Sequence, residues 1–448
     1  MVLLEFKLSN YFELSLLLFI FCYFIKILIF FIKKNYAIFL SYLFETEITA
    51  MKYLKSICQF LLFLQCGIFP VLSQTIWPTK SWSSASPKDL GLNPDTLAML
   101  DASFVNGSNG YMDGLLVIRH GKIAYQHTYP HDYAQIYKEQ VNHKSGLNAN
   151  DPSGPYNYFN DWWHPWYHHT NLHTLQSVTK TVTSVIIGVA IARKDFPDIN
   201  TPVLRFFDTT QIKHIDDRKR RMTIKHLLTM TAGLSWDENV HYDDPKNDCS
   251  VMEAGFDWVG YVINKPMTEE PGTKFNYNSG ATQLLAYIFR VATGKDIETY
   301  AVEHLFKPLG IESHFWKRIP TGLVDTEGGL YLSPPDLAKI FYLYLHNGEW
   351  AGKQLVNPDW VKQSVTPQIS IGGGMQYGYK WWLQSIGQNP AVDIWHGSGF
   401  GGQFPIVIPA YDMVVVFNAW NILPGKPGMH FQEAMRMILN AVVSEKKK

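Results

Sequence analysis

Ser177 and Lys180, a serine and a lysine three residues apart, could together attack a carbonyl group. On a helix, side chains at this spacing share a face, so the lysine amine would stand beside the serine hydroxyl. A serine hydroxyl becomes a strong nucleophile only when a base takes its proton, and a lysine with a depressed pKa can do so. A helix beginning near Leu175 would also place Ser177 in its first turn, where unpaired N–H groups favour developing negative charge. Alone, however, this tetrapeptide occurs by chance in many proteins of this length.

Four more segments follow the Ser-x-x-Lys segment in order, at 223–234, 271–279, 328–333 and 396–402. In this order and at these separations, the set resembles the serine β-lactamase-like superfamily. That superfamily includes class C β-lactamases, D-alanyl-D-alanine carboxypeptidases, related esterases and nylon-oligomer hydrolases. The resemblance covers about residues 90–442 and implies a β-lactamase/transpeptidase-like fold.

Carried over by position, the resemblance implies that Ser177 is the nucleophile and Lys180 the lysine of the first motif. Tyr277 matches the tyrosine of the second motif, which is commonly Tyr-x-Asn and here reads Tyr277-Asn278-Ser279. Ser279 lacks the reach of an amide, which weakens substrate-amide recognition of the β-lactamase kind.

The third motif of the family is Lys-Thr-Gly, or has His in place of Lys, whereas this chain has His396-Gly397-Ser398-Gly399. Either Gly397 stands at the basic position, or His396 does and one residue is inserted. In both registers a permanent cation is missing, which weakens the grip on a substrate carboxylate. Neutral esters or amides are therefore favoured over carboxylate-bearing β-lactams and D-Ala-D-Ala peptides.

These residues predict an acyl-enzyme mechanism that uses no cofactor and no metal. Tyr277 and Lys180 would share the proton network that deprotonates Ser177. The N–H of Ser177 and a second N–H near Gly399 or Phe400 would hold the oxyanion, and water would release the acyl group. The substrate would be a small ester, amide or peptide-like molecule contacted by Ser279, His396 and Ser398. A β-lactamase or D,D-carboxypeptidase, and a non-catalytic ligand-binding protein on the same scaffold, remain alternatives.

The elements that must position these residues indicate an α/β (α+β) fold. Runs at 114–119 and 122–127, joined by His120-Gly121, predict a hairpin. Further strands are expected at 404–408 and 413–417, and helices at 95–100, 174–194, 224–230, 281–293 and 428–444. We therefore expect one antiparallel sheet made from both ends of the chain and flanked by helices. It would form a single domain over 88–448, with a mostly helical subregion at about 195–325.

The first 73 residues carry two apolar runs. The run at 14–32 is long enough to span a membrane, and the run at 57–72 follows a basic stretch at 51–55. The second layout predicts a signal peptide at 51–73, cut after Ser73 and followed by a linker at 74–87. The protein would then be exported, to the periplasm or outside the cell. Residues 1–50 are either a membrane anchor, which would tether the protein, or sequence upstream of a start at Met51, which we favour.

Composition and the histidines exclude other classes. Hydrophobic residues make up 46% of the 448 residues, and 39 Lys+Arg balance 39 Asp+Glu, so neither disorder nor a nucleic-acid partner is expected.

His164 and His168 have the spacing of metal ligands on a helix, but Pro165 disfavours a helix there. We interpret this His- and Trp-rich stretch, which also contains His169 and His173, as a wall of the substrate pocket. The oligomeric state is left open.

Overall fold

The computed structural model describes residues 23–26, 77–148, 151–387, 390–426 and 428–443. The chain divides into two compact units, residues 1–74 and 75–448. The expected anchor and signal peptide fall almost entirely outside the described residues, apart from 23–26, which are helical and exposed. Among the described residues, no helix has both the length and the apolar character needed to cross a bilayer.

A nine-stranded sheet forms the centre of the unit at 75–448. Its order is β1 (Ser83–Ser84), β3 (Lys122–Thr128), β2 (Met112–Arg119), β14 (Met413–Ala419), β13 (Phe404–Ile408), β12 (Val392–His396), β11 (Trp382–Ile386), β10 (Met375–Tyr377) and β9 (Ile369–Gly372). All neighbours are antiparallel except β1, which lies within the segment expected as a linker and runs parallel to β3.

The sheet joins the two ends of the chain, as the sequence predicted. β2 and β3 form the expected hairpin, and His120 and Gly121 at its turn both have positive φ angles, 52° and 70°. This conformation matches the twist of the flanking strands. β14, from the last part of the chain, pairs with β2 along its length, with Val415 opposite Val117.

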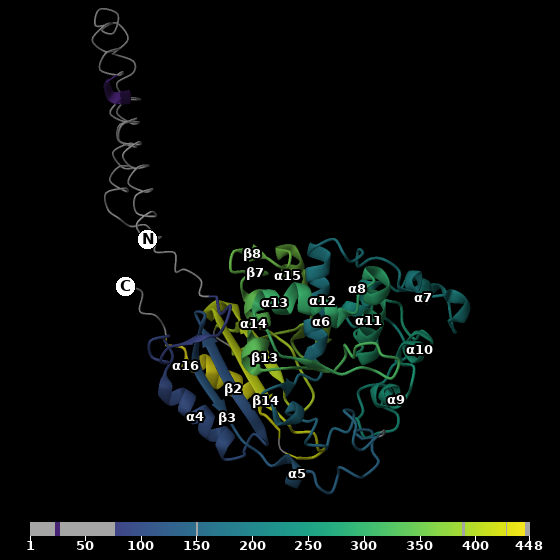
Figure 1. Ribbon diagram of the computed structural model, residues 1–448, viewed down its shortest axis with the longest axis horizontal. Coiled ribbons are helices and arrows are strands. Elements are labelled where there is room, and N and C mark those ends of the chain that lie inside the picture. Colours follow the sequence, from purple (N-terminus) through teal and green to yellow (C-terminus); the bar gives the residue numbers. More distant parts are fainter. Residues whose placement is uncertain (1–22, 27–76, 149–150, 388–389, 427, 444–448) are drawn as a thin grey trace, which may run out of the picture. The chain divides into compact units, whose positions relative to one another are not determined.

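Helices cover both faces of the sheet (Figure 1). α4 (Pro94–Val105) and α16 (Phe431–Ala441) cover one face, where they pack against alternate strand residues such as Val117 and Val415. Residues of the opposite parity, such as Leu116 and Val416, face α6 (Val178–Ala192) and α14 (Pro334–Leu345). The sheet therefore has two separate apolar cores, as period-two strands require when both faces are covered.

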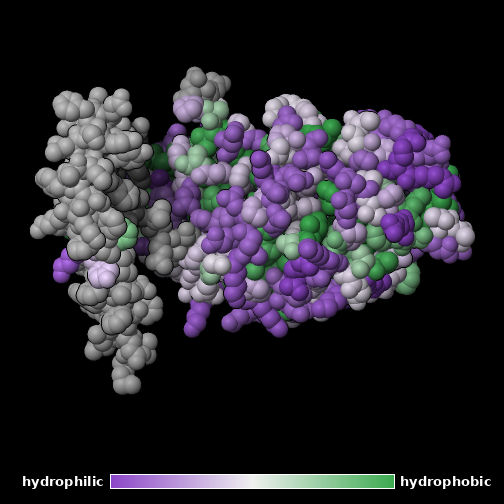
Figure 2. All heavy atoms as spheres, turned by 90° about the horizontal axis from the view of Figure 1, so that it is seen from above, coloured by the Kyte–Doolittle hydropathy of each residue, from purple (hydrophilic) through white to green (hydrophobic). Residues whose placement is uncertain are grey.

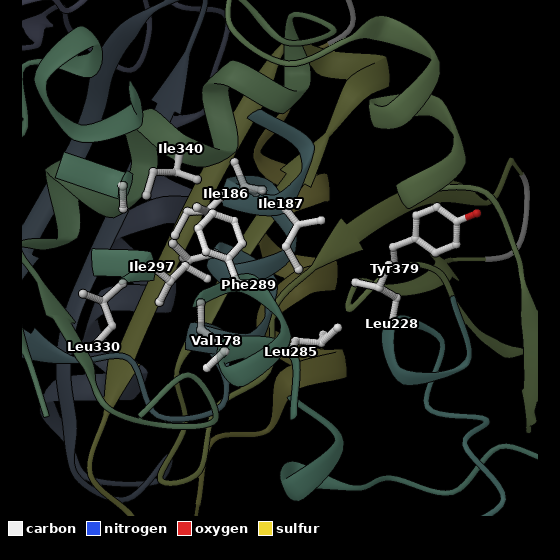
Figure 3. Packing of buried hydrophobic residues seen from close by; sticks show 14 of the residues in the cluster. Val178, Ile186, Ile187, Leu228, Leu285, Phe289, Ile297, Leu330, Ile340 and Tyr379 are labelled. Carbon is white, nitrogen blue, oxygen red and sulfur yellow. The ribbon is translucent and has the colours of Figure 1, made fainter. Parts of the chain in front are cut away.

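α6 lies inside the larger core, and every residue from Val178 to Ala190 is buried. Its C-terminal half is apolar, as is expected of a helix inside a core, whereas its N-terminal half also buries Lys180 and four Thr or Ser residues. Its neighbours include Leu285 and Phe289 of α11 (Ser279–Thr293), as Figure 3 shows. At Gly188 a Cβ atom would lie 2.3 Å from Trp360 Nε1, so only glycine fits there.

A small sheet positions the N-terminal end of α6. It consists of β4 (His173–Thr174), β6 (Leu330–Leu332) and β5 (Phe315–Trp316). Beyond it, the N–H of Leu175 donates to Leu330 O at 2.9 Å. In return, the N–H of Leu330 donates to Thr179 Oγ1 at 3.2 Å. The segment before β6 is thereby held against the start of α6.

Short helices and irregular segments make up most of the region at 195–325, so the expectation of a mostly helical subregion is too strong. α8 (Ile224–Leu228) begins after the predicted cap Thr223, and α11 ends at Gly294, which has a φ of 71°. The remaining helices are α5 (Tyr133–Ile136), η1 (Tyr167–His169), η2 (Val203–Phe206), η3 (Thr209–Gln211), α7 (Asp217–Arg221), α9 (Asp248–Ala254), α10 (Trp258–Ile263), α12 (Ile297–Ala301), η4 (Val302–Phe306), α13 (Lys307–Leu309), α15 (Pro358–Ser364) and η5 (Pro409–Tyr411). A two-stranded hairpin, β7 (Glu349–Trp350) and β8 (Lys353–Gln354), follows α14. On the face seen in Figure 2, hydrophobic residues are interspersed among hydrophilic ones.

Candidate active site

Ser177 is the residue immediately before α6, at its N-cap position. The expected helix start near Leu175 is wrong, because Gln176 has a φ of 46°, a left-handed conformation that interrupts the helix. The Gln176 side chain donates to Thr174 Oγ1 at 2.9 Å, which supports this bend. The N–H of Ser177 donates to no acceptor among the described residues. It is thus available at the positive end of the α6 dipole.

Lys180 is buried and its amine touches three oxygen atoms. The Nζ atom lies 2.9 Å from Ser177 Oγ, 2.7 Å from Glu327 O and 3.1 Å from Glu327 Oε2. Burial lowers the pKa of Lys180, but the charges of Tyr277 and Glu327 outweigh burial and raise its pKa well above the usual value. The expectation of a depressed pKa is therefore wrong, because the sequence did not reveal these neighbours.

Tyr277 completes the predicted trio. Its ring centroid lies 5.3 Å from Lys180 Nζ. Burial raises the pKa of Tyr277, while the charge of Lys180 and hydrogen bonding with Ser177 lower it without cancelling that effect. Ser177, Lys180 and Tyr277, which are up to 100 residues apart in the chain, are thus brought together.

Glu238 is an anionic residue of the site that the sequence did not reveal. Its carboxylate accepts hydrogen bonds from the Ser279 hydroxyl at 2.6 Å and the Ser279 N–H at 2.8 Å. Tyr242 donates to it at 2.9 Å and the Trp236 indole at 2.8 Å. Burial raises the pKa of Glu238, and the charge of Lys180 opposes that rise. Ser279 therefore uses its hydroxyl to hold Glu238, where the sequence suggested a substrate contact.

Gly397 and His396 of the third motif lie in different surroundings. A Cβ atom on Gly397 would lie 3.1 Å from Val178 Cγ1 and 3.3 Å from Thr181 Oγ1, so Gly397 faces α6. His396 instead packs beside Phe431 of α16, with 5.3 Å between ring centroids. Burial lowers the pKa of His396 to about 4, so the ring is neutral. Gly397 thus faces α6, whereas His396 packs against α16.

The glycine-rich stretch after Ser398 lies against the start of α6. A Cβ atom on Gly399 would lie 2.5 Å from Leu175 O, so this close approach requires glycine. The N–H of Gly399 already donates to Gln403 O at 2.9 Å. The N–H of Phe400 has no acceptor among the described residues. Of the two residues expected near the oxyanion, Phe400 is the one with a free donor.

Lys380 is a buried lysine that the sequence did not reveal. Its Nζ atom lies 3.2 Å from Met230 Sδ, and its carbonyl accepts the Thr181 hydroxyl at 2.8 Å. Burial lowers the pKa of Lys380 well below the usual value, and the charge of Lys180 lowers it further. Lys380 precedes β11 in an irregular segment and has a φ of 66°, so no helix or strand pattern in the sequence points to it.

Aromatic side chains and a cavity lie beside Tyr277. Trp382 of β11 contacts the rings of Phe275, Tyr277 and Tyr377, with centroids 5.2 to 6.2 Å away. A cavity of about 510 Å³ opens next to Tyr277 and Phe275. The His- and Trp-rich stretch expected to form a pocket wall lines two other cavities. Its Trp166 and His169 line cavities of about 600 and 220 Å³ that include none of the three predicted catalytic residues.

One group of side chains among the described residues has the spacing of metal ligands. The ligand atoms of Cys249, Glu253 and Glu327 all lie within 4.8 Å of one another, and none of the histidines considered above belongs to the group. Lys180 already provides a positive charge to this group, because it forms an ion pair with Glu327 at 3.1 Å.

Residues 113–427 match the Beta-lactamase family, and the chain belongs to that family. A stretch of 127 residues is 30% identical to the monacolin J acid methylbutanoyltransferase of Aspergillus terreus, over 27% of this chain and 30% of that protein. The chain thus spans under a third of the length of this curated relative.

Two solved structures show the same fold. A family VIII carboxylesterase is 15% identical with a TM-score of 0.55, and the match covers 80% of this chain and 98% of that one. A D-stereospecific amidohydrolase from Streptomyces sp. is 15% identical with a TM-score of 0.54, over 78% of this chain and 99% of that one. These neighbours carry names of ester- and amide-cleaving enzymes, and at this identity they establish the fold alone.

Proposed function

We propose that the protein is a serine hydrolase that cleaves neutral esters or amides through an acyl-enzyme on Ser177. The contact of 2.9 Å between Lys180 Nζ and Ser177 Oγ carries this proposal. A nucleophile within hydrogen-bond reach of its base, at a helix N-terminus with a free N–H, is the arrangement that acyl transfer needs.

The mechanism requires that the Lys180–Tyr277 pair first loses one proton to solvent, which leaves the Lys180 amine able to act as a base. The Ser177 hydroxyl proton then moves to the Lys180 amine as Oγ bonds to the carbonyl carbon. The carbonyl electron pair moves to its oxygen, which the N–H groups of Ser177 and Phe400 stabilise. When the tetrahedral intermediate collapses, the leaving group takes a proton from the Lys180–Tyr277 pair. Water then repeats the sequence on the acyl-enzyme.

The charges around Ser177 favour a neutral substrate. Glu238 places a carboxylate near Lys180, and Gly397, which we align with the family's basic position, has no side chain. A substrate carboxylate would meet the charge of Glu238 and find no cation at position 397. We therefore rank β-lactams and D-alanyl peptides below neutral esters and amides, and nitrocefin hydrolysis tests that ranking.

Acyl transfer to an alcohol is a second candidate function. The curated relative from Aspergillus terreus is named as an acyltransferase. An alcohol that replaces water in the second step would give this outcome with the same residues. Product analysis in the presence of primary alcohols separates transfer from hydrolysis.

We also propose that the protein is exported by a signal peptide at 51–73. Edman sequencing of the protein from its native host tests this. A mature chain that begins near Gln74 supports export and excludes an anchor at 1–50.

Labelling with a fluorophosphonate probe tests the proposed function. Wild-type protein should incorporate one probe molecule and hydrolyse p-nitrophenyl butyrate. Ser177→Ala should do neither while it keeps its circular dichroism spectrum. A wild-type protein that binds ligands but shows neither reaction would support the non-catalytic alternative.

A further inference from the structure

A second buried group of charged residues contacts Lys180 through Glu327. Glu327 contacts the Lys180 amine through both its carbonyl and its carboxylate, at 2.7 and 3.1 Å. A lysine ammonium has three N–H donors, and Ser177 Oγ takes the third at 2.9 Å. A neutral amine has two N–H donors and one lone pair. It would fit equally well, with both N–H groups directed to Glu327 and the lone pair directed to the Ser177 hydroxyl.

The backbone holds Glu327 in this position. Asp325 Oδ1 accepts the N–H groups of Glu327 and Gly328, both at 3.0 Å. Thr326 is bonded to α11, since its hydroxyl donates to Thr282 O at 2.9 Å. The same segment continues into β6, which is held against α6. The Glu327 carboxylate is therefore placed by the elements that place Ser177.

Glu253 of α9 lies next to Glu327 and accepts the Tyr158 hydroxyl at 2.7 Å. Burial and the Glu327 charge raise the pKa of Glu253 well above its usual value. Burial alone would raise the pKa of Glu327, but the charge of Lys180 and hydrogen bonding with Glu253 hold it below the usual value. The pair thus keeps one proton on Glu253 and one negative charge on Glu327, opposite Lys180.

We propose that Glu327 is a positioning residue that completes a Ser177–Lys180–Glu327 relay, with its carboxylate stabilising the Lys180 ammonium that forms when Ser177 attacks. This inference rests on the proposed function. The Ser177 proton moves to Lys180 Nζ, the Oγ–carbon bond forms, and the new positive charge faces Glu327 without any further proton transfer. The carboxylate acts as the aspartate of a Ser-His-Asp triad acts on its imidazolium.

Other titratable groups surround Lys180 and Glu327. The charges of Tyr277, Glu238 and Lys380 also interact with that of Lys180. The Cys249 thiol of α9 lies 3.9 Å from Glu327 Oε1. Beyond Glu253, Lys317 pairs with Asp325 at 3.8 Å. Burial raises the pKa of the Cys249 thiol well above its usual value, so the neutral thiol adds no charge beside Lys180, and Cys249→Ala is a matched control for disturbing this core.

Steady-state kinetics from pH 6 to 10.5 with p-nitrophenyl butyrate test the relay. Glu327→Gln should lower kcat about a hundred-fold with KM within about two-fold, as removal of a supporting carboxylate does elsewhere. The acid limb of kcat/KM should move to lower pH, because Lys180 loses a charge that raises its pKa. A merely structural loss would not move this limb. Cys249→Ala should keep the wild-type kcat and acid limb.

Glu327→Asp keeps the charge on a shorter side chain and should restore part of the rate, with an acid limb closer to that of the wild type. If Glu327→Gln does not fold, this variant still decides. A Glu327→Asp variant whose kcat is still about a hundred-fold below wild type, or a wild-type rate and acid limb in Glu327→Gln, would overturn the relay. Wild-type protein that resists fluorophosphonate instead refutes the proposed function itself, so the two failures are distinct.

Discussion

The hydroxyl of Ser279 donates to Glu238 Oε1 at 2.6 Å, so the residue at the third position of the Tyr-x-Asn motif holds a carboxylate beside Lys180. Replacement of this charge should change which substrates the enzyme prefers. In Glu238→Gln, the ratio of kcat/KM for an anionic ester to that for a matched neutral ester should rise about tenfold, because a repulsion is removed. Ser279→Ala keeps the charge and should change the ratio much less. An unchanged ratio in Glu238→Gln would show that Glu238 does not face the substrate.

Lys180 and Tyr277 act on the same proton, so their losses should not add. Lys180→Ala and Tyr277→Phe should each lower kcat about a thousand-fold, and the double variant should be hardly worse than either. Initial rates and fluorophosphonate labelling of all three variants measure this. Additive losses would mean that the two residues serve separate steps.

The rate should rise with pH into the alkaline range. The active form lacks one proton of the Lys180–Tyr277 pair, and the pKa values of both residues lie above their usual values. Activity is therefore present above the pKa of the pair and lost as the pH falls through it. A profile of kcat/KM measures this limb. His396→Gln should leave the limb in place, since His396 lies beside α16 with a pKa of about 4. A limb near pH 6 that disappears in His396→Gln would contradict this assignment.

Gly188 allows α6 to approach Trp360 closely. In Gly188→Ala, a methyl group would lie 2.3 Å from Trp360 Nε1, and the free energy of unfolding should fall by about 1–3 kcal/mol. Urea unfolding measures the change. Ser184→Ala is the control on the same helix, because the buried Ser184 hydroxyl has no hydrogen-bond partner among the residues that the structure describes. It should change stability by less than about 0.5 kcal/mol or increase it. Equal effects of the two variants would contradict the packing argument.

The sequence predicted the elements that have strong local signals. The hairpin at His120-Gly121, the strands near Val415 and the end of α11 at Gly294 all follow from periodicity and turn chemistry. The trio of Ser177, Lys180 and Tyr277 came from ordered motifs, and the structure brings the three side chains together.

What the sequence could not predict lies in irregular segments. Glu238, Glu327 and Lys380 stand outside regular elements and reach the site only through tertiary contacts. The start of α6 was misplaced because Gln176 adopts a left-handed conformation that its residue type does not announce. The side of the sheet on which His396 lies could not be predicted either. His396 is the last residue of β12, and a shift of one residue in the strand would turn its side chain to the opposite face.

The most direct test of the account is rapid acid quench of the enzyme during turnover of p-nitrophenyl butyrate, followed by intact-mass and peptide analysis. We predict a protein carrying one butyryl group, mapped to Ser177 and absent from Ser177→Ala. A butyryl group on another residue, or undiminished turnover by Ser177→Ala, would contradict the account.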